Sequence, residues 1–351
     1  MRILNGVYMV LPLLFAGTPE VAVPSLRLLA QDTENFEIRA VLTRPDAPTG
    51  RGRKLVPSPV KQAALELGLE VWESNPSEEE SFIEQIKNSG VKAAAVVAYG
   101  KILRESVLNA VPLGWYNLHF SLLPQWRGAA PVQRAIWAGD EITGATVFRI
   151  TKGMDSGPIL AQYTTEIGKH ETSGELLNRL SIDGAPLLSA SLSAVESGSA
   201  NPVEQNPGSY DVAQKITVDD AHIRFDVPAF VADRQIRACT PNPGAWCNIV
   251  AKQDYDLNQD LSSDSKSDSK SDSLPIKLHV LKCALANSED LITRNINNLL
   301  PGKLFVDKHH VWVGTSNGVL ELQEVKAQGK KAMKAADWAR GAHLSDNSYC
   351  E

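Results

Sequence analysis

The sequence predicts two domains, an α/β domain built on a mostly parallel sheet and, after it, a small β-barrel. Three observations lead to this prediction. The chain has 351 residues, and at roughly 100–200 residues per domain this length suits two domains. Short apolar runs alternate with amphipathic stretches over residues 1–198, which is the pattern of repeated βαβ units. Short β-rich runs separated by turns dominate residues 211–351, which is typical of a small barrel.

Apolar runs in the first domain predict six strands. The run Ala-Ala-Ala-Val-Val-Ala at 93–98 is apolar on both faces, as a central strand of a parallel sheet should be. The expected strands cover residues 10–16, 36–43, 93–99, 116–119, 145–151 and 159–165. A first helix is expected at Thr18-Pro19, with Thr18 as N-cap and Pro19 as the first helical residue. The other expected helices cover residues 59–67, 78–88, 102–110, 131–138 and 173–196.

A polar stretch with two prolines, residues 199–210, predicts a linker between domains at 1–198 and 211–351. The expected strands of the barrel cover residues 246–250, 276–281, 303–306, 310–314 and 319–325. Residues 262–273 contain only Ser, Asp and Lys and have no apolar side chain to bury. We therefore expect a disordered insertion over residues 256–274.

Composition excludes several classes of protein. Hydrophobic residues make up 43% and charged residues 22% of the chain, which rules out a collagen-like or wholly disordered protein. The net charge of −6 rules out a simple polycation that coats nucleic acid, although local basic patches are compatible with an RNA substrate. The four cysteines show no C-x-x-C spacing and indicate reduced thiols in a cytoplasmic protein. No apolar run reaches the ~18–20 residues that span a membrane.

The N-terminus has two interpretations. Residues 1–18 contain one Arg and an apolar stretch, as a signal peptide does. We favour a buried first strand instead, because Pro12 interrupts the apolar run and a helix is expected to begin directly after it. Either Met1 or Met9 can be the initiator.

The densest group of candidate functional residues lies at the end of the strand expected at 116–119. Asn117 and His119 are two residues apart, so strand alternation places both side chains on one face. Open α/β sheets bind their ligands beyond the carboxyl ends of their strands. Asn offers an amide donor and His changes charge near neutral pH, so the pair can stabilise an oxyanion and handle a proton. A His–Asn pair that merely caps a turn is the alternative, and for an isolated N-x-H pair it is the commoner outcome.

Two loops beside this strand carry further candidates. Residues 152–158 join two expected strands and place Asp155 between glycines, which a β-turn alone explains. A carboxylate brought next to His119 would instead orient it or take the proton from a nucleophile. Residues 121–124, Ser-Leu-Leu-Pro, form a short apolar loop that either packs locally or lines a pocket for a flat ligand.

Residues 43–59 form a long loop that Pro and Gly should make irregular. Its four cations are candidate phosphate ligands: Arg44, Arg51, Arg53 and Lys54. The loop lacks the spacing of a P-loop, and no G-x-G-x-x-G follows a strand, which argues against a dinucleotide dehydrogenase. The spacing of the histidines and cysteines suits no metal site, so we predict none.

These segments together resemble the methionyl-tRNA formyltransferases, within the wider family of formyltetrahydrofolate-dependent formyltransferases. The resemblance covers nearly the whole chain, with three departures. Phe120 stands where many members have a smaller residue, the insertion is an extra element, and the N-terminus is several residues longer than in the family. The matching segments are residues 15–19, 45–61, 98–100, 117–131, 153–157, 215–216, 236–238, 243–246 and 329–333.

The resemblance implies transfer of the formyl group of 10-formyltetrahydrofolate to the α-amino group of methionyl initiator tRNA, for initiation of translation. It also implies a Rossmann-like catalytic domain followed by an OB-like, tRNA-binding barrel. Carried over to this sequence, the catalytic residues would be Asn117, His119 and Asp155, and the folate-binding segment would be Ser121, Leu122, Leu123 and Pro124. The tRNA contacts would come from Arg44, Arg51, Arg53 and Lys54, with Arg51 in a loop that enters the acceptor stem, and from Lys330, Lys331 and Lys334. We expect a monomer.

In such a reaction the amine attacks the formyl carbonyl, whose oxygen becomes negative. We expect Asn117 and His119 to donate hydrogen bonds to this oxyanion, and Asp155 or His119 to take the proton that the amine loses.

Three alternatives stay open. A formyltransferase that acts on a small amine, such as a nucleotide sugar or glycinamide ribonucleotide, and a formyltetrahydrofolate hydrolase would both use the same triad. The basic loop and the barrel weigh against them, because a small substrate or water needs neither. A non-catalytic RNA-binding module would explain the barrel but would leave the Asn–His–Asp group without a role.

Overall fold

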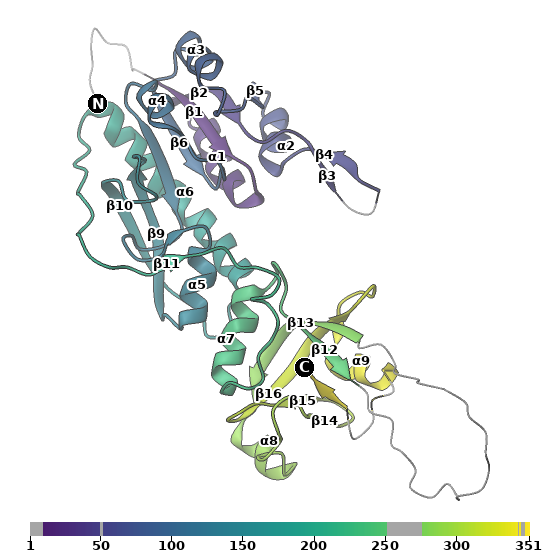
Figure 1. Ribbon diagram of the computed structural model, residues 1–351. Helices are drawn as coiled ribbons and strands as arrows, with labels where there is room; N and C mark the ends of the chain where they lie inside the picture. The colour runs from purple at the N-terminus through teal and green to yellow at the C-terminus, as the bar shows by residue number, and fades with distance from the viewer. Residues whose placement is uncertain (1–9, 50–51, 251–275, 343, 345–347) are drawn as a thin grey trace, which may run out of the picture. The chain divides into compact units, whose positions relative to one another are not determined.

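The computed structural model describes residues 10–49, 52–250, 276–342, 344 and 348–351 (Figure 1). Arg51, the candidate initiators Met1 and Met9, and the insertion expected at 256–274 lie outside the described residues. The chain folds as two compact units, each with a large sheet of its own. Unit 1 comprises Met1–Val132, Glu141–Ile167 and Glu175–Lys215, and unit 2 comprises Gln133–Asp140, Gly168–Gly174 and Ile216–Glu351.

Unit 1 is built on a seven-stranded sheet in the order β10-β9-β7-β6-β1-β2-β5. The strands from β5 to β7 run parallel, whereas β9 and β10 are antiparallel to their neighbours. Their bounds are β1 Leu11–Gly17, β2 Phe36–Leu42, β5 Val71–Trp72, β6 Ala93–Val97, β7 Trp115–His119, β9 Ile142–Arg149 and β10 Ile159–Glu166. The six predicted strands are confirmed, and the Rossmann-like parallel sheet with them, while the short β5 was not predicted.

The core of unit 1 lies around β6, whose five residues are all buried between β1 and β7. This confirms the central strand predicted from the apolar run. On one face, Leu14 and Ala16 of β1 belong to a cluster with Phe82 of α3 and Val107 of α4. The helices of the first part of the chain are α1 Val23–Gln31, α2 Pro59–Glu66, α3 Glu79–Ser89, α4 Glu105–Asn109, α5 Pro131–Ala138 and α6 Ser173–Ser197.

Two local predictions in unit 1 were wrong. Thr18 is not an N-cap: Pro19 occupies that position of a 3₁₀ helix at Glu20–Ala22, which leads into α1. The Thr18 hydroxyl instead donates to the carbonyl oxygen of Tyr99 at 3.2 Å and joins the ends of two parallel strands. The basic loop is not irregular throughout, because β3 (Ala47–Thr49) and β4 (Lys54–Val56) pair in an antiparallel hairpin within it.

Unit 2 contains an antiparallel sheet in the order β14-β15-β16-β13-β12-β18, with β17 beside β16. A bridge between Lys303 and Tyr349 brings the two end strands together, so the sheet is nearly closed into the predicted barrel. The strands are β12 Trp246–Val250, β13 Ile276–Leu285, β14 Leu304–Val306, β15 Val311–Gly314, β16 Val319–Ala327, β17 Met333–Lys334 and β18 Tyr349–Cys350. Three helices of this unit were not predicted: α7 Ala229–Cys239, α8 Ser288–Thr293 and α9 Ala335–Gly341.

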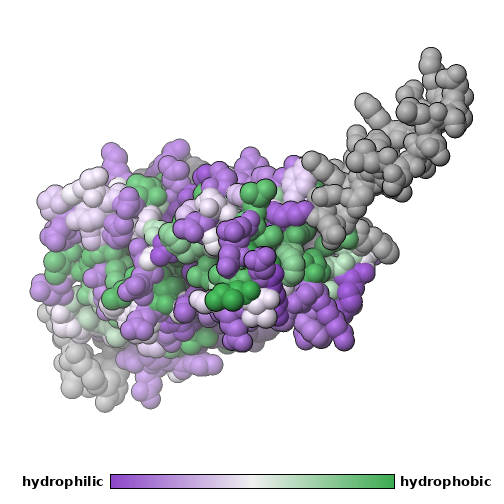
Figure 2. Space-filling view, turned by 90° about the horizontal axis from the view of Figure 1, so that it is seen from below, coloured by the Kyte–Doolittle hydropathy of each residue, from purple (hydrophilic) through white to green (hydrophobic). Residues whose placement is uncertain are grey.

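The surface mixes polar and apolar side chains. Figure 2 shows one face, on which hydrophobic residues are interspersed with hydrophilic ones. Among the described residues, the most exposed large apolar residue is Ile102, with an exposed fraction of 91%. No helix among the described residues is long and apolar enough to cross a membrane.

Candidate functional site

The candidate site lies where the sheet of unit 1 changes from parallel to antiparallel. β7 is parallel to β6 on one side and antiparallel to β9 on the other. Its carboxyl end carries Asn117 and His119, which pair with Phe148 and Thr146 of β9. Residues two apart in a strand share a face, so the sheet presents both side chains on the same side, as the sequence predicts.

His119 is buried, with an exposed fraction of 6%, and its two ring nitrogens have different partners. Nε2 lies 2.9 Å from the carbonyl oxygen of Trp126. A carbonyl oxygen can only accept, so Nε2 carries the hydrogen and Nδ1 of the neutral ring carries a lone pair. Burial lowers the pKa of His119 below 6.5, and this outweighs the opposite effects of Asp155 and of the Trp126 carbonyl. The neutral imidazole is therefore the favoured form at neutral pH.

Asp155 faces the free nitrogen of that ring. Its Oδ2 lies 3.8 Å from Nδ1 of His119 and accepts a hydrogen bond of 2.8 Å from the backbone N–H of Gly128. Asp155 lies in the loop between β9 and β10 with φ of +47°, in the left-handed region that non-glycine residues rarely adopt. The gap between Nδ1 and Oδ2 is too long for a direct hydrogen bond, and it leaves two acceptors facing the same space.

Asn117 contributes an unsatisfied group to the same face. Its Oδ1 is buried and has no hydrogen-bond partner among the described residues. Most buried polar side-chain atoms in proteins are hydrogen-bonded, so an unpaired one calls for an explanation. A bound molecule that brings an N–H group would supply the missing partner, while the amide N–H₂ of Asn117 remains a donor.

The segment at 121–124 is fixed by side chains from the two antiparallel strands. Thr146 Oγ1 donates to the carbonyl oxygen of Ser121 at 2.7 Å and accepts from the backbone N–H of Leu123 at 3.1 Å. Gln162 Nε2 donates to the carbonyl oxygen of Leu123 at 2.9 Å. Ser121 and Leu123 are buried, whereas Leu122 and Pro124 are half-buried, so these last two are the accessible members of the segment.

The predicted basic residues lie in both units. In unit 1, Arg53 and Lys54 are exposed at the β3–β4 hairpin, and Arg44 donates to the carbonyl oxygen of its neighbour Pro45 at 2.8 Å. Arg51 lies outside the described residues. In unit 2, three exposed lysines follow β16 or lie at the start of α9: Lys330, Lys331 and Lys334.

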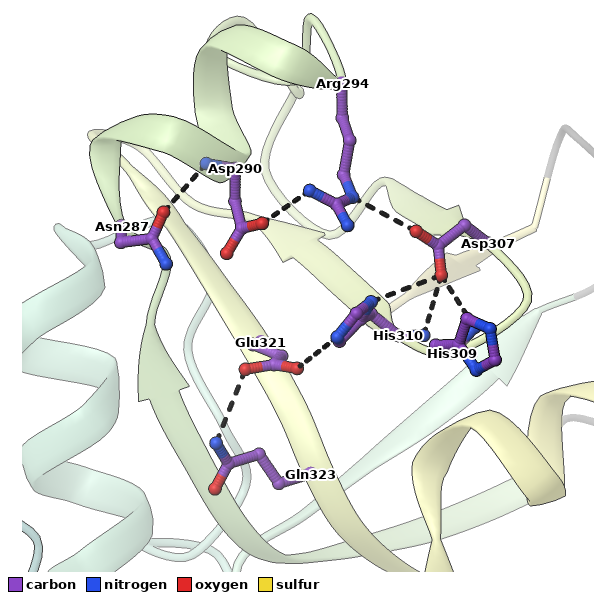
Figure 3. Close-up of polar contacts among 8 residues, drawn as sticks. All are labelled: Asn287, Asp290, Arg294, Asp307, His309, His310, Glu321 and Gln323. Atoms are coloured by element: carbon purple, nitrogen blue, oxygen red, sulfur yellow. Dashed lines mark hydrogen bonds and ion pairs between the residues drawn. The ribbon is translucent and has the colours of Figure 1, made fainter.

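A second group of titratable residues lies in the barrel and has internal partners (Figure 3). Arg294 donates to Asp307 at 3.0 Å and also to Asp290. Asp307 Oδ1 accepts the backbone N–H groups of His309 at 2.7 Å and His310 at 2.8 Å. Desolvation raises the pKa of Asp307, but these hydrogen bonds prevail and lower it to about 2. Since each charge of this network has a partner, we interpret it as structural.

No group of three or more His, Cys, Asp or Glu side chains among the described residues could hold a metal ion. Sequence reasoning missed Thr146 and Gln162, which anchor the segment at 121–124. Both lie inside strands, where Thr and Gln are common on a half-polar face, and their partners lie 16 to 39 residues away in the chain.

This arrangement suits transfer of an acyl group to an amine. An amine loses a proton as it attacks a carbonyl group, and Nδ1 of His119 with Asp155 Oδ2 provides two adjacent acceptors for it. The Asn117 amide can donate to the oxygen that becomes negative.

Comparisons with known proteins agree with this chemistry. A formyl transferase family model matches residues 11–192, and the model of the formyl transferase C-terminal domain matches residues 215–343. The chain is 65% identical to a methionyl-tRNA formyltransferase of Bifidobacterium adolescentis, over 97% of this chain and 100% of the relative. It is 44% identical to a protein of the same name from Streptomyces coelicolor, over 95% of this chain and 97% of the relative.

Solved structures share the fold at lower identity. An N-formyltransferase from Helicobacter canadensis, in complex with folinic acid and dTDP-3-aminofucose, aligns with a TM-score of 0.57 and 19% identity. The alignment covers 89% of this chain and 99% of that structure. At this identity the likeness establishes the fold alone.

Proposed function

The chain belongs to the formyl transferase family, and we propose that it transfers the formyl group of 10-formyltetrahydrofolate to the α-amino group of methionyl initiator tRNA. The observation that carries the chemistry is the pair of acceptors, His119 Nδ1 and Asp155 Oδ2, beside the amide of Asn117, whose oxygen has no hydrogen-bond partner among the described residues. The substrate follows from relatives that carry the name methionyl-tRNA formyltransferase and span nearly the whole chain.

In the proposed mechanism the amine nitrogen forms a bond to the formyl carbon, and the carbonyl oxygen takes the negative charge. The Asn117 amide donates to this oxygen; such a donor is typically worth ~2.7–4 kcal/mol. The oxyanion then collapses and the bond from the formyl carbon to N10 of the folate breaks. One proton leaves the amine and one reaches N10, so tetrahydrofolate and the formylated amine are the products.

His119 acts first as a base in this mechanism. Its neutral ring uses its single N–H on the Trp126 carbonyl, so Nδ1 takes the proton of the attacking amine. The resulting imidazolium is stabilised by the Asp155 carboxylate, and only then can Nδ1 donate to the oxyanion or to the leaving nitrogen. The sequence-based expectation of His119 as an oxyanion donor thus applies to the protonated ring.

The proposal assigns catalysis to the domain at 1–198 and tRNA binding to the basic hairpin and to the domain at 211–351, with 199–210 between them. Leu122 and Pro124 would contact the folate, because they are the accessible members of the segment that Thr146 and Gln162 hold. The exposed cations at β3–β4 and after β16 would contact phosphates. We also propose that the enzyme is a cytoplasmic monomer that needs no metal.

The deciding experiment measures formyl transfer to methionyl initiator tRNA, with methionyl elongator tRNA, a nucleotide-linked aminosugar and glycinamide ribonucleotide as competing acceptors. A reaction without any amine measures hydrolysis. We expect formylated initiator tRNA as the main product, slow hydrolysis and no loss of rate with a metal chelator. Formate release that is equally fast without an amine would establish a hydrolase instead, and preference for a small amine would establish one of the other transferases.

A further inference from the structure

The expected linker at 199–210 and the short strand that follows it are hydrogen-bonded beside both loops of the candidate site. At one end, Val203 and Ile159 exchange backbone hydrogen bonds of 2.7 and 2.8 Å. At the other end, β11 (Val212–Ala213) pairs in parallel with β8 (Arg127–Gly128). β8 supplies the Gly128 N–H that holds Asp155, so this segment borders the catalytic loops directly.

Between these attachments, Gln205 is half-buried while the residues on either side of it are exposed. Its Nε2 donates to the carbonyl oxygens of Asp155 at 2.9 Å and Gly157 at 2.8 Å. Its Oε1 accepts from Nε of Arg127 at 3.0 Å and from Nη2 at 2.5 Å. The amide therefore uses both of its N–H donors and both lone pairs of its oxygen.

The hydrogen bonds of Gln205 hold the loop of Asp155, whose own backbone lies in the left-handed region. A non-glycine residue in the left-handed region persists only where its surroundings fix it. Gln205 holds the carbonyl group of Asp155, and Gly128 holds its carboxylate at 2.8 Å. Arg127 precedes Gly128, so one side chain joins the loop that carries Asp155 to the strand that receives it.

We propose that Gln205 is a positioning residue, whose amide holds the Asp155 loop against β8 so that the Asp155 carboxylate faces Nδ1 of His119. The proposal rests on the proposed function, in which this pair handles the proton of the attacking amine. A side chain that merely tethered the segment would affect stability but not the proton transfer.

The test compares two variants of the full chain with one control. Gln205→Met keeps the length of the side chain and removes every hydrogen bond; we expect kcat to fall roughly 10- to 100-fold, the order of loss that follows misplacement of a catalytic group. Gln205→Glu keeps an acceptor for Arg127 but loses the donors to the Asp155 loop, so it should be as slow. KM values should change less than about twofold, because neither variant alters a group that touches substrate. Glu204→Gln, at the exposed neighbouring position, should match the parent.

The pH profile separates positioning from stability. Asp155 raises the pKa of His119, so a displaced carboxylate should shift the acid limb of kcat/KM for Gln205→Met to lower pH. An unchanged kcat and profile in folded Gln205→Met, or recovery of activity in Gln205→Glu, would overturn the proposal. If Gln205→Met does not fold, Gln205→Glu carries the test through its kcat. Asp155→Asn runs in parallel: its inactivity beside a normal Gln205→Met refutes only the role of Gln205, whereas an active Asp155→Asn refutes the role of Asp155 in the proposed mechanism. A parent protein that formylates no initiator tRNA refutes the proposed function.

Discussion

Replacing Asn117 with Leu removes the amide of the candidate site and keeps the number and branching of the side-chain heavy atoms. Asn117 Oδ1 is buried without a hydrogen-bond partner among the described residues. A buried unsatisfied polar atom destabilises the folded state by about 1–3 kcal/mol. The folded protein therefore carries a cost at this position that a hydrogen-bond donor, from a bound substrate or an ordered water, would offset.

The expected result separates activity from stability. Loss of one oxyanion donor should lower kcat by roughly 10²- to 10³-fold. The free energy of unfolding should stay within about 1 kcal/mol of the parent or increase by up to about 3 kcal/mol, because the variant no longer buries an unpaired oxygen. Steady-state formylation of charged initiator tRNA measures the first quantity, and urea unfolding measures the second.

Thr146→Val is the matched control for stability. Thr146 is fully buried like a core residue, but its hydroxyl bonds Ser121, Leu123 and Gln162. Removing it takes this partner from the Ser121 carbonyl oxygen and the Leu123 N–H, so the free energy of unfolding should fall by about 1–3 kcal/mol. If Asn117→Leu destabilised the protein as much as Thr146→Val, or kept its activity, the argument that Asn117 is held for a ligand would be wrong.

Three further outcomes are expected. His119→Ala and Asp155→Asn should each sharply lower kcat, and the double variant should be little worse than the more damaging single one, because the groups act as a unit; additive losses in ln kcat would contradict this. The pKa of Asp307 is lowered from 3.8 to about 2, so its carboxylate stabilises the folded state fully above pH 4, and this stabilisation disappears as the pH falls toward 2. The side chain is 32% exposed, so after allowance for screening Asp307→Asn should lower the free energy of unfolding by about 1–2 kcal/mol at pH 7. The variant should also weaken the dependence of this free energy on pH over the same window. Lys330→Ala with Lys331→Ala should weaken tRNA binding and lower the log–log salt slope by roughly 0.7–0.9 for each phosphate that the variant no longer neutralises, whereas an unchanged slope would exclude both lysines from the interface.

The sequence predicted the parts of the fold that a local pattern encodes. The run at 93–98 has no polar face, and β6 is buried on both faces in the middle of the sheet. Helix α7 escaped prediction because Asp233 and Gln235 break its apolar face, although both are buried. Their partners lie within and outside the helix: Asp233 pairs with Arg237 one turn along α7, and Gln235 donates to the carbonyl oxygens of Asp220 and His222, which lie before the helix in the chain.

The candidate site shows the same difference between what a local sequence pattern encodes and what only the fold brings together. Asn117 and His119 were found from their spacing, because strand alternation is a local rule. Gln205 lies 50 residues from Asp155 and 78 from Arg127 in the chain, so only the folded structure shows that it joins them. A polar stretch with two prolines offers no reason to single out one glutamine, since such stretches are usually solvated.

The tautomer of His119 connects the fold to the proposed chemistry. A histidine with two free nitrogens could serve as donor or acceptor, and the sequence alone allows both roles. The Trp126 carbonyl takes the N–H of the neutral ring, and burial favours that neutral form. The lone pair of Nδ1 therefore faces Asp155, and the two acceptors cannot satisfy each other until a proton enters between them. The ammonium that forms during amine attack is such a proton source, so the resting geometry is complementary to the charge that develops in the reaction rather than to the ground state.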